Sequence, residues 1–238
     1  GGNSPAGVNS IDSIEMQSRG NAADFGDLTS RTNFKYLATG IQSSSTRGVF
    51  GGGGTHPVYK DIIDYVTIAT FGDAADFGDL TEARLASGEL SSSTRGVTTG
   101  GFASNSVTNV MDYITIASTG DATDFGDISV ARRYLSGLAS STRGCQAGGG
   151  TPDQSNVIDY ITIASTGDAA DFGDLTVTLS YSGAASNKTR GIWGCFGNGS
   201  ISTVIDYVTI ASTGDATDFG DISTSRYSAQ GVSDSHGG

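Results

Sequence analysis

The stretch Gly120-Asp121-Ala122-Thr123-Asp124-Phe125-Gly126-Asp127 returns along this chain with little change and divides it into units of similar length. Its phenylalanine recurs at five positions: Phe25, Phe77, Phe125, Phe172 and Phe219. The steps between them are 52, 48, 47 and 47 residues. Internal repetition with a period of roughly 20 to 50 residues is typical of solenoids, propellers and other repeat arrays. The sequence therefore predicts five copies of one structural unit.

Two further phrases accompany this anchor in most units. An apolar run precedes it, as in Ile158-Asp159-Tyr160-Ile161-Thr162-Ile163-Ala164, and Ser-Thr-Arg-Gly follows it, as in Ser141-Thr142-Arg143-Gly144. The apolar run is rich in β-branched and aromatic residues, and in an extended strand both of its faces would be largely apolar. No window has the 3.6-residue apolar period of a helix. These patterns predict an all-β fold whose strands are covered on both faces.

The two ends of the chain complement each other. Residues 1–28 hold an incomplete copy of the apolar run and the anchor, and residues 226–238 resemble the start of a unit. For the unit that leads to Phe172 we expect strands over residues 134–139, 142–148, 157–165 and 171–176. An open solenoid needs capping repeats, whereas a ring needs its last unit joined to its first. The sequence thus predicts one domain over residues 1–238, a five-bladed β-propeller of four-stranded antiparallel blades, closed by pairing the N- and C-terminal half-repeats.

The composition narrows the classes of partner. The 25 acidic residues exceed the 13 basic ones and give a formal net charge of -12, which repels nucleic acid and anionic membrane surfaces. No apolar run reaches the roughly 20 residues of a membrane-spanning helix. We therefore expect neither a nucleic-acid partner nor membrane insertion. Cys145 and Cys195 lie in successive units, which permits a disulfide without requiring one; the ordinary interpretation is two small buried thiols.

An aspartate stands inside the apolar run of four units, where an unpaired carboxylate would cost several kcal/mol. These residues are Asp64, Asp112, Asp159 and Asp206. The repeated arginine is an obvious counter-ion, because a guanidinium offers a fork of donors to a carboxylate. These arginines are Arg47, Arg95, Arg143 and Arg190. The pattern predicts a structural ring of Asp to Arg contacts that fixes the packing of the blades.

The sequence gives little support for a catalytic site. His56 and His236 are the only histidines, and neither a Gly-x-Ser-x-Gly elbow nor a phosphate-binding Gly-x-x-x-x-Gly-Lys loop occurs. Asp121, Asp124 and Asp127 could present oxygens to Ca²⁺, but no copy has the denser spacing of a calcium loop. We expect a non-enzymatic protein without a cofactor, with calcium as the alternative. The single tryptophan, Trp193, is expected in the core.

Several of these residues resemble a kelch repeat. Arg132, the strand that follows Arg143 and ends in Gly148-Gly149-Gly150, the Ile158-Asp159-Tyr160 strand and Phe172 are similar to the kelch pattern of an arginine, a strand with a double glycine, and two spaced aromatics. The resemblance covers nearly the whole chain and implies a β-propeller. The sequence departs from kelch units in placing Phe where they usually carry Trp.

The uniform wording of the units resembles a second group of proteins. The phrase Asp-Tyr-Ile-Thr-Ile-Ala-Ser-Thr-Gly, followed by Ala-Thr-Asp-Phe-Gly-Asp, is similar to repeats in virion structural proteins of tailed bacteriophages, marine ones especially. The resemblance implies a component of the extracellular virion, such as a fibre, a tail part or a capsid decoration. Its partners would then be other virion proteins or a glycan or protein on the host surface.

A specific site is expected where the units differ, because shared residues serve the shared scaffold. They differ most between the second and third strands, in loops that share one rim with the connections from fourth to first strand. Aromatic and amide side chains there suit sugar binding by stacking and hydrogen bonding. The candidates are His56, Tyr59, Phe102, Asn105, Gln154, Asn156, Phe196 and Asn198. The hypothesis is an attachment module; the alternatives are a purely architectural virion protein with merely variable loops, or a free-standing propeller lectin.

Overall fold

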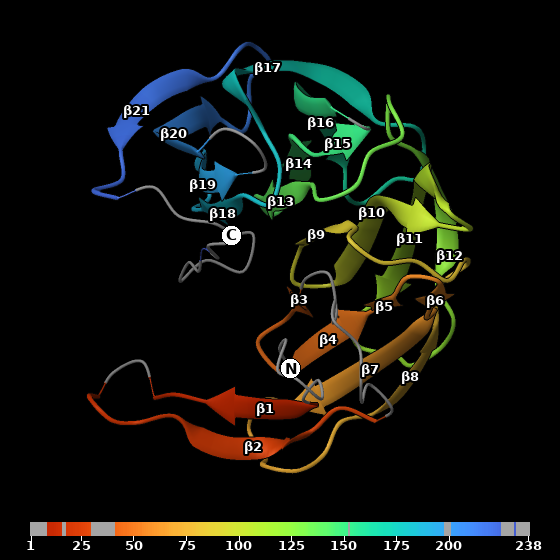
Figure 1. Ribbon diagram of the computed structural model, residues 1–238. Coiled ribbons are helices and arrows are strands. Elements are labelled where there is room, and N and C mark those ends of the chain that lie inside the picture. The colour runs from red at the N-terminus through yellow and green to blue at the C-terminus, as the bar shows by residue number, and fades with distance from the viewer. Residues whose placement is uncertain are drawn as a thin grey trace.

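The computed structural model describes residues 9–15, 18–29, 41–151, 153–197, 201–224 and 231. Within these residues every regular element is a β-strand, and none is a helix. The strands form successive antiparallel sheets in chain order (Figure 1). The all-β prediction is therefore confirmed.

Five sheets, numbered here in chain order, each contain one anchor phenylalanine in their last strand. The first comprises β1 (Ser10–Ser13) and β2 (Ala23–Asp27). The second comprises β3 (Ile41–Ser43), β4 (Arg47–Gly51), β7 (Ile62–Thr67) and β8 (Ala75–Asp79). The third comprises β9 (Gly88–Ser91), β10 (Arg95–Ala103), β11 (Ser106–Thr115) and β12 (Thr123–Asp127).

The later sheets repeat the same strand order. The fourth comprises β13 (Ser136–Ala139), β14 (Arg143–Ala147), β16 (Asp153–Thr162) and β17 (Ala170–Leu179), and adds the short β15 (Gly150–Thr151). The fifth comprises β18 (Gly183–Ser186), β19 (Arg190–Gly197), β20 (Ile201–Thr209) and β21 (Thr217–Asp221). A separate hairpin of β5 (Gly54–Thr55) and β6 (Val58–Tyr59) stands between β4 and β7.

The sheets lie side by side around a common centre (Figure 1). The first strands β3, β9, β13 and β18 are innermost, and the fourth strands β8, β12, β17 and β21 are outermost. Neighbouring first strands contact one another, β3 with β9, β9 with β13, and β13 with β18. The hairpin β1–β2 and the fifth sheet stand at the two ends of this arrangement. The predicted blade of four antiparallel strands is thus present in several copies.

The four strands predicted for the fourth sheet are present, but most of their boundaries differ from the prediction. The first strand, β13, begins at Ser136 rather than at residue 134, and β16 begins at Asp153 rather than at residue 157. The third strand, β16, ends at Thr162 rather than at residue 165, because the amide of Ser165 bonds the carbonyl of Thr162 and closes a turn (3.1 Å). The fourth strand, β17, runs on to Leu179, where it pairs with Ser155. The end of a strand is hard to predict from sequence where the residues that follow it are of the same types as those within it.

The core lies between consecutive sheets. At each junction the anchor phenylalanine of one sheet packs against the apolar run of the next, as Phe125 and Ile128 do against Ile161 and Ile163. Burying a side chain of this size contributes about 2–3 kcal/mol, and this contact repeats at every junction between described sheets. Trp193 belongs to the same kind of core, as expected; its indole is 1% exposed and donates to the carbonyl of Ser136 (3.0 Å).

The Asp-Phe-Gly-Asp phrase forms a close backbone contact at the junction between consecutive sheets. Gly126 has φ of +132°, and a Cβ there would lie 2.6 Å from the carbonyl oxygen of Gly167 in the next sheet. The amide of Gly167 donates to the carbonyl of Phe125 (2.7 Å), and the amide of Asp127 donates to the Asp168 carboxylate (3.0 Å). Only glycine tolerates this approach of two backbones. The repeated aspartates therefore serve backbone contacts between sheets.

The predicted contacts between the repeated arginines and the strand aspartates are wrong. Arg47 lies opposite Thr67 and stacks over Tyr65 (4.5 Å), while Asp64 lies opposite Phe50. Because side chains alternate between the faces of a strand, this register puts arginine and aspartate on opposite faces. Arg47, Arg95 and Arg143 instead donate to carbonyl oxygens of Ile116, Ile163 and Ile210 at 2.9–3.0 Å. Arg190 stacks over Tyr207 in the same way.

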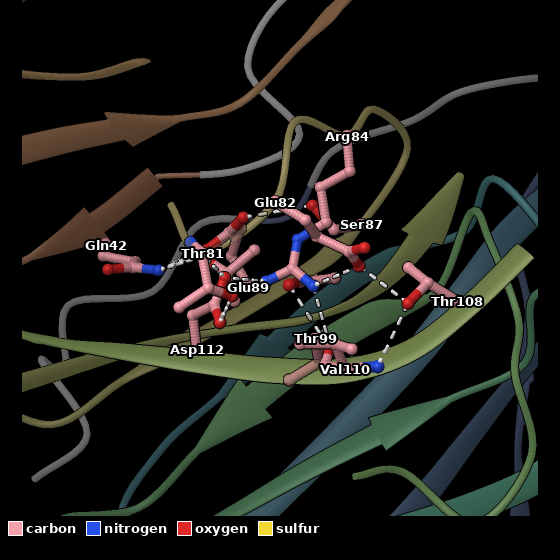
Figure 2. A network of polar contacts seen from close by, with 12 residues as sticks. Gln42, Thr81, Glu82, Arg84, Ser87, Glu89, Thr99, Thr108, Val110 and Asp112 are labelled. Atoms are coloured by element: carbon pink, nitrogen blue, oxygen red, sulfur yellow. Dashed lines mark hydrogen bonds and ion pairs between the residues drawn. The ribbon is translucent and has the colours of Figure 1, made fainter. Parts of the chain in front are cut away.

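The strand aspartates bind the preceding fourth-to-first connection instead. The carboxylate of Asp112 pairs with Arg84 and accepts hydrogen bonds from the hydroxyl and the amide of Thr81 (Figure 2). Arg84 also lies 3.4 Å from Glu82, which accepts from the hydroxyl of Thr108 (2.7 Å). Burial raises the pKa of the Asp112 carboxyl, and the Arg84 charge opposes that rise. The sequence pattern did not indicate Arg84 as the counter-ion of Asp112, because Arg84 lies before the first strand of the unit and not beside the apolar run.

The other strand aspartates show two variations on this arrangement. Asp64 and Asp206 accept from the hydroxyls of Thr29 (2.6 Å) and Thr176 (2.7 Å). Asp159 pairs with Arg132, and both side chains are fully buried. Serine replaces the threonine in that unit, and the second oxygen of Asp159 has no hydrogen-bond partner among the residues described. Arg132 is therefore the principal donor that compensates the buried charge of Asp159.

Cys145 carries a free thiol, which confirms the thiol alternative for this residue; the side chain of Cys195 lies outside the described residues. Burial raises the pKa of the Cys145 thiol to about 12. Because the thiolate is the reactive form, we expect Cys145 to resist iodoacetamide in the folded protein in mildly alkaline buffer and to be alkylated in urea. Peptide mass spectrometry locates the label. Rapid labelling of Cys145 in the native protein would contradict this prediction.

Candidate binding site

Loops from different sheets are joined by backbone hydrogen bonds on one face of the molecule. Leu85, which follows β8, forms an antiparallel bridge with Phe102 near the end of β10. Arg133, which follows β12, forms the same bridge with Gly150 in β15. Each bridge connects a fourth-to-first connection with the strand residues that border a second-to-third loop. This agrees with the expectation that these two kinds of connection share one rim.

Three of the predicted candidate residues form an aromatic cluster on this rim. The rings of His56, Tyr59 and Phe102 lie with their centroids 6.0–6.4 Å apart. The hydroxyl of Tyr59 donates to the side-chain oxygen of Asn105 (2.9 Å), a fourth candidate. His56 and Asn105 are exposed, and the other two are half-buried. The structure thus brings together four candidates that come from two sheets.

The cluster continues across the next two sheets. The guanidinium of Arg133 lies over the ring of Phe102 (4.6 Å) and near that of Tyr134 (5.1 Å). Tyr134 in turn stacks on Tyr181, with centroids 3.8 Å apart and planes inclined by 25°. We call this set the aromatic strip. It consists of His56, Tyr59, Phe102, Arg133, Tyr134 and Tyr181.

The backbone holds the tyrosines of the strip in a costly conformation. Tyr134 and Tyr181 have φ of +61° and +58°, and Ala86 has the equivalent angle of +59° in the preceding connection. The amide of Tyr134 bonds the carbonyl of Ala86 (2.6 Å), and the amide of Tyr181 bonds that of Tyr134 (3.2 Å). A left-handed backbone costs a non-glycine residue on the order of 1–3 kcal/mol and concentrates at functional sites. The scaffold therefore fixes these two rings rather than leaving them on a loose loop.

The remaining candidates lie beside the strip or outside the described residues. Gln154 in β16 donates to the hydroxyl of Ser180 (3.4 Å), the residue before Tyr181. Asn156 is half-buried further along β16. The side chain of Phe196 and all of Asn198 lie outside the described residues.

Sequence reasoning missed Arg133, Tyr134 and Tyr181. A signal was available, because these residues occupy the connection before the first strand, where the preceding unit has Leu85-Ala86. The candidate residues predicted from the sequence all come from the second-to-third loops. Comparing the other connection on the same rim would have found all three residues.

Neither a metal site nor a membrane-spanning helix is found in the described part of the chain. No group of three or more His, Cys, Asp or Glu side chains there could hold a metal ion. The carboxylate of Asp121, one of the calcium candidates, accepts from the amide of Asp79 (3.1 Å) across a junction. None of the described segments is a helix long and apolar enough to cross a membrane.

No protein-family model matches this sequence, and no curated protein matches it either.

Proposed function

We propose that the chain closes into a five-bladed β-propeller and serves as a non-enzymatic attachment module of a phage virion, whose aromatic strip engages a glycan on the host surface. The virion assignment rests on the resemblance of the repeated phrase. The glycan assignment rests on one observation, the continuous row of rings that four sheets contribute to a single face.

Ring closure is supported by what the two ends of the molecule present. At the described junctions the apolar run contributes a buried side chain that packs beside the preceding anchor phenylalanine. These side chains are Val66, Ile114, Ile161 and Val208, each at most 8% exposed. Ile14 holds the equivalent position in the first sheet and is 68% exposed, and the last anchor, Phe219, is 52% exposed. Two matching halves of one junction thus stand open at opposite ends.

The position of Gly231, which follows β21 in the chain, also supports closure. A Cβ on Gly231 would lie 2.3 Å from the carbonyl oxygen of Ala184 in β18. Gly137 in β13 approaches the carbonyl of Glu89 in β9 in the same manner, with a corresponding distance of 2.2 Å. Gly231 therefore takes the place of a first-strand residue beside the fifth sheet. Together with β1 and β2, which hold third- and fourth-strand positions, such a strand would belong to one shared blade.

Aromatic faces suit sugars because the C–H faces of pyranose rings pack on them and hydroxyl groups bond nearby amides. Tyr59 and Asn105 place a hydroxyl and an amide beside the rings. A preformed row also lowers the entropy lost on binding. The aromatic strip thus meets the requirements of a site for an extended oligosaccharide.

A glycan array with the 238-residue protein tests this function. We expect saturable binding, and we expect Phe102→Ala and Tyr134→Ala each to weaken it several-fold, up to about tenfold, because an aromatic contact contributes roughly 0.5–1.5 kcal/mol beyond its buried area. Phe71→Ala is the matched control, since Phe71 is 69% exposed and lies outside the strip. Absence of binding, together with assembly into a regular lattice in electron micrographs, would instead support a purely architectural virion protein.

A further inference from the structure

Arg133 differs from the arginines that hold the sheets together. Those side chains donate to carbonyl or carboxylate oxygens: Arg47, Arg84, Arg95, Arg132 and Arg143. Three of them, Arg47, Arg95 and Arg143, also lie over tyrosine rings, as does the exposed Arg190. The guanidinium of Arg133 lies over the ring of Phe102 and near that of Tyr134. Among the described residues it donates no hydrogen bond and pairs with no carboxylate, and it is half-buried. Its N–H donors are therefore free while its plane is supported by aromatic rings.

This arrangement suits an anionic group of a ligand. A planar guanidinium presents paired donors that match a carboxylate or a sulfate, and contact with an aromatic face limits its freedom before binding. The protein as a whole carries a net charge of -12. Asp153, on the adjoining β15–β16 hairpin, is exposed and forms no ion pair with Arg133. A half-buried guanidinium that bonds neither a carbonyl nor a carboxylate among the described residues points to a negative charge supplied by the partner.

We propose that the aromatic strip binds an acidic oligosaccharide, with the carboxylate or sulfate of one sugar on Arg133 and neighbouring sugars over the flanking rings. This inference rests on the proposed glycan-binding function and names its ligand class. Arg133 lies between the cluster of His56, Tyr59 and Phe102 and the stacked pair of Tyr134 and Tyr181. The charged contact therefore stands in the middle of the strip, with apolar contacts on both sides.

The test compares three probes of equal length by isothermal titration calorimetry. They are an oligogalacturonate, which carries carboxylates, a sulfated dextran oligosaccharide, and a neutral maltooligosaccharide. We expect one or both acidic probes to bind at least roughly tenfold more tightly than the neutral probe, because a hydrogen-bonded contact to a charged group commonly contributes that much. The advantage should shrink as salt is added. The two acidic probes distinguish carboxylate from sulfate recognition.

Variants assign the preference to Arg133. Arg133→Gln should remove the advantage of the acidic probe, and Arg133→Lys should keep part of it, since lysine retains the charge without the planar fork. Lys188→Gln is the matched control, because it removes the same charge from an exposed residue of the turn that joins β18 to β19. Circular dichroism verifies that each variant folds.

The outcomes separate the two proposals. Equal affinity for acidic and neutral probes, or an advantage that Arg133→Gln leaves unchanged, would overturn the acidic-ligand inference, while binding weakened by Phe102→Ala would still support glycan binding. Absence of binding by every probe, on the array as well, would overturn both.

Discussion

Arg132→Leu is expected to lower the free energy of unfolding by about 3–5 kcal/mol, because it leaves the buried carboxylate of Asp159 without its ionic partner. Both side chains are fully buried, and the second oxygen of Asp159 has no partner among the described residues. Arg132 also donates to the carbonyls of Gly148 and Val157 (both 2.9 Å), which would lose a donor. Equilibrium unfolding in urea, followed by circular dichroism, measures the loss.

Arg84→Leu is the matched control for that loss. Asp112, its partner, would keep the hydroxyl and amide of Thr81 as donors. We therefore expect a smaller loss, about 1.5–3 kcal/mol, the usual range for hydrogen bonds to a charged group. Equal losses in the two variants would show that the hydrogen bonds from Thr81 do not compensate the charge of Asp112.

The chain contains a natural solution without arginine, which allows a rescue experiment. At the junction between the fourth and fifth sheets Leu179 holds the arginine position, and Asp206 accepts from the hydroxyl and amide of Thr176 (2.7 and 2.9 Å). Adding Ser129→Thr to Arg132→Leu recreates this combination at Asp159. The double variant should recover about 1 kcal/mol or more of the lost stability. No recovery would mean that the hydroxyl does not reach Asp159.

The second large effect concerns closure of the ring. Ile14→Ala should lower the free energy of unfolding by about 2–5 kcal/mol if Ile14 is buried against Phe219, as its equivalents are at the other junctions. Val130→Ala, at a residue that is 48% exposed, should change it by no more than about 0.5 kcal/mol. A double-mutant cycle of Ile14→Ala with Phe219→Ala should give a coupling of roughly 0.5–3 kcal/mol.

The cycle also identifies the failure of closure. If the two ends remain apart, Ile14→Ala behaves like the Val130 control and the coupling is zero within error. Association between molecules would bury the same residues, so sedimentation over a range of concentrations accompanies the measurement. Coupling that vanishes on dilution would indicate head-to-tail contacts between copies rather than a closed ring.

The repeated blade could be predicted from the sequence because its causes are local. Residue types that are close together in the chain, such as the run Ile158-Asp159-Tyr160-Ile161 and the turn residues beside it, indicate a strand. The nearly constant step between anchors indicates that the unit repeats. The candidate residues on the rim could be predicted for the same reason, because an alignment of the repeats along the chain shows where they differ. Four of them, His56, Tyr59, Phe102 and Asn105, meet in the structure.

The pairing of charges could not be predicted in this way. The assumption that Arg143 compensates Asp159 took two repeated residues of one unit as neighbours. Strand register places them on opposite faces, and the partner of Asp159 is Arg132, from the connection that enters the sheet. Which face a side chain occupies depends on a register of one residue, and a shift of one reverses it.

By itself the sequence determined the all-β class, the repeated four-stranded unit and the rim on which variation gathers, because these follow from residue type and spacing along one chain. Only the tertiary structure decided which units exchange contacts. The backbone contact between Gly126 and Gly167 joins two sheets. The Arg132 to Asp159 pair and the contact of Arg133 with Phe102 join a connection between sheets to a strand distant in the sequence. Such contacts depend on the distance and angle between packed sheets, which no single repeat contains.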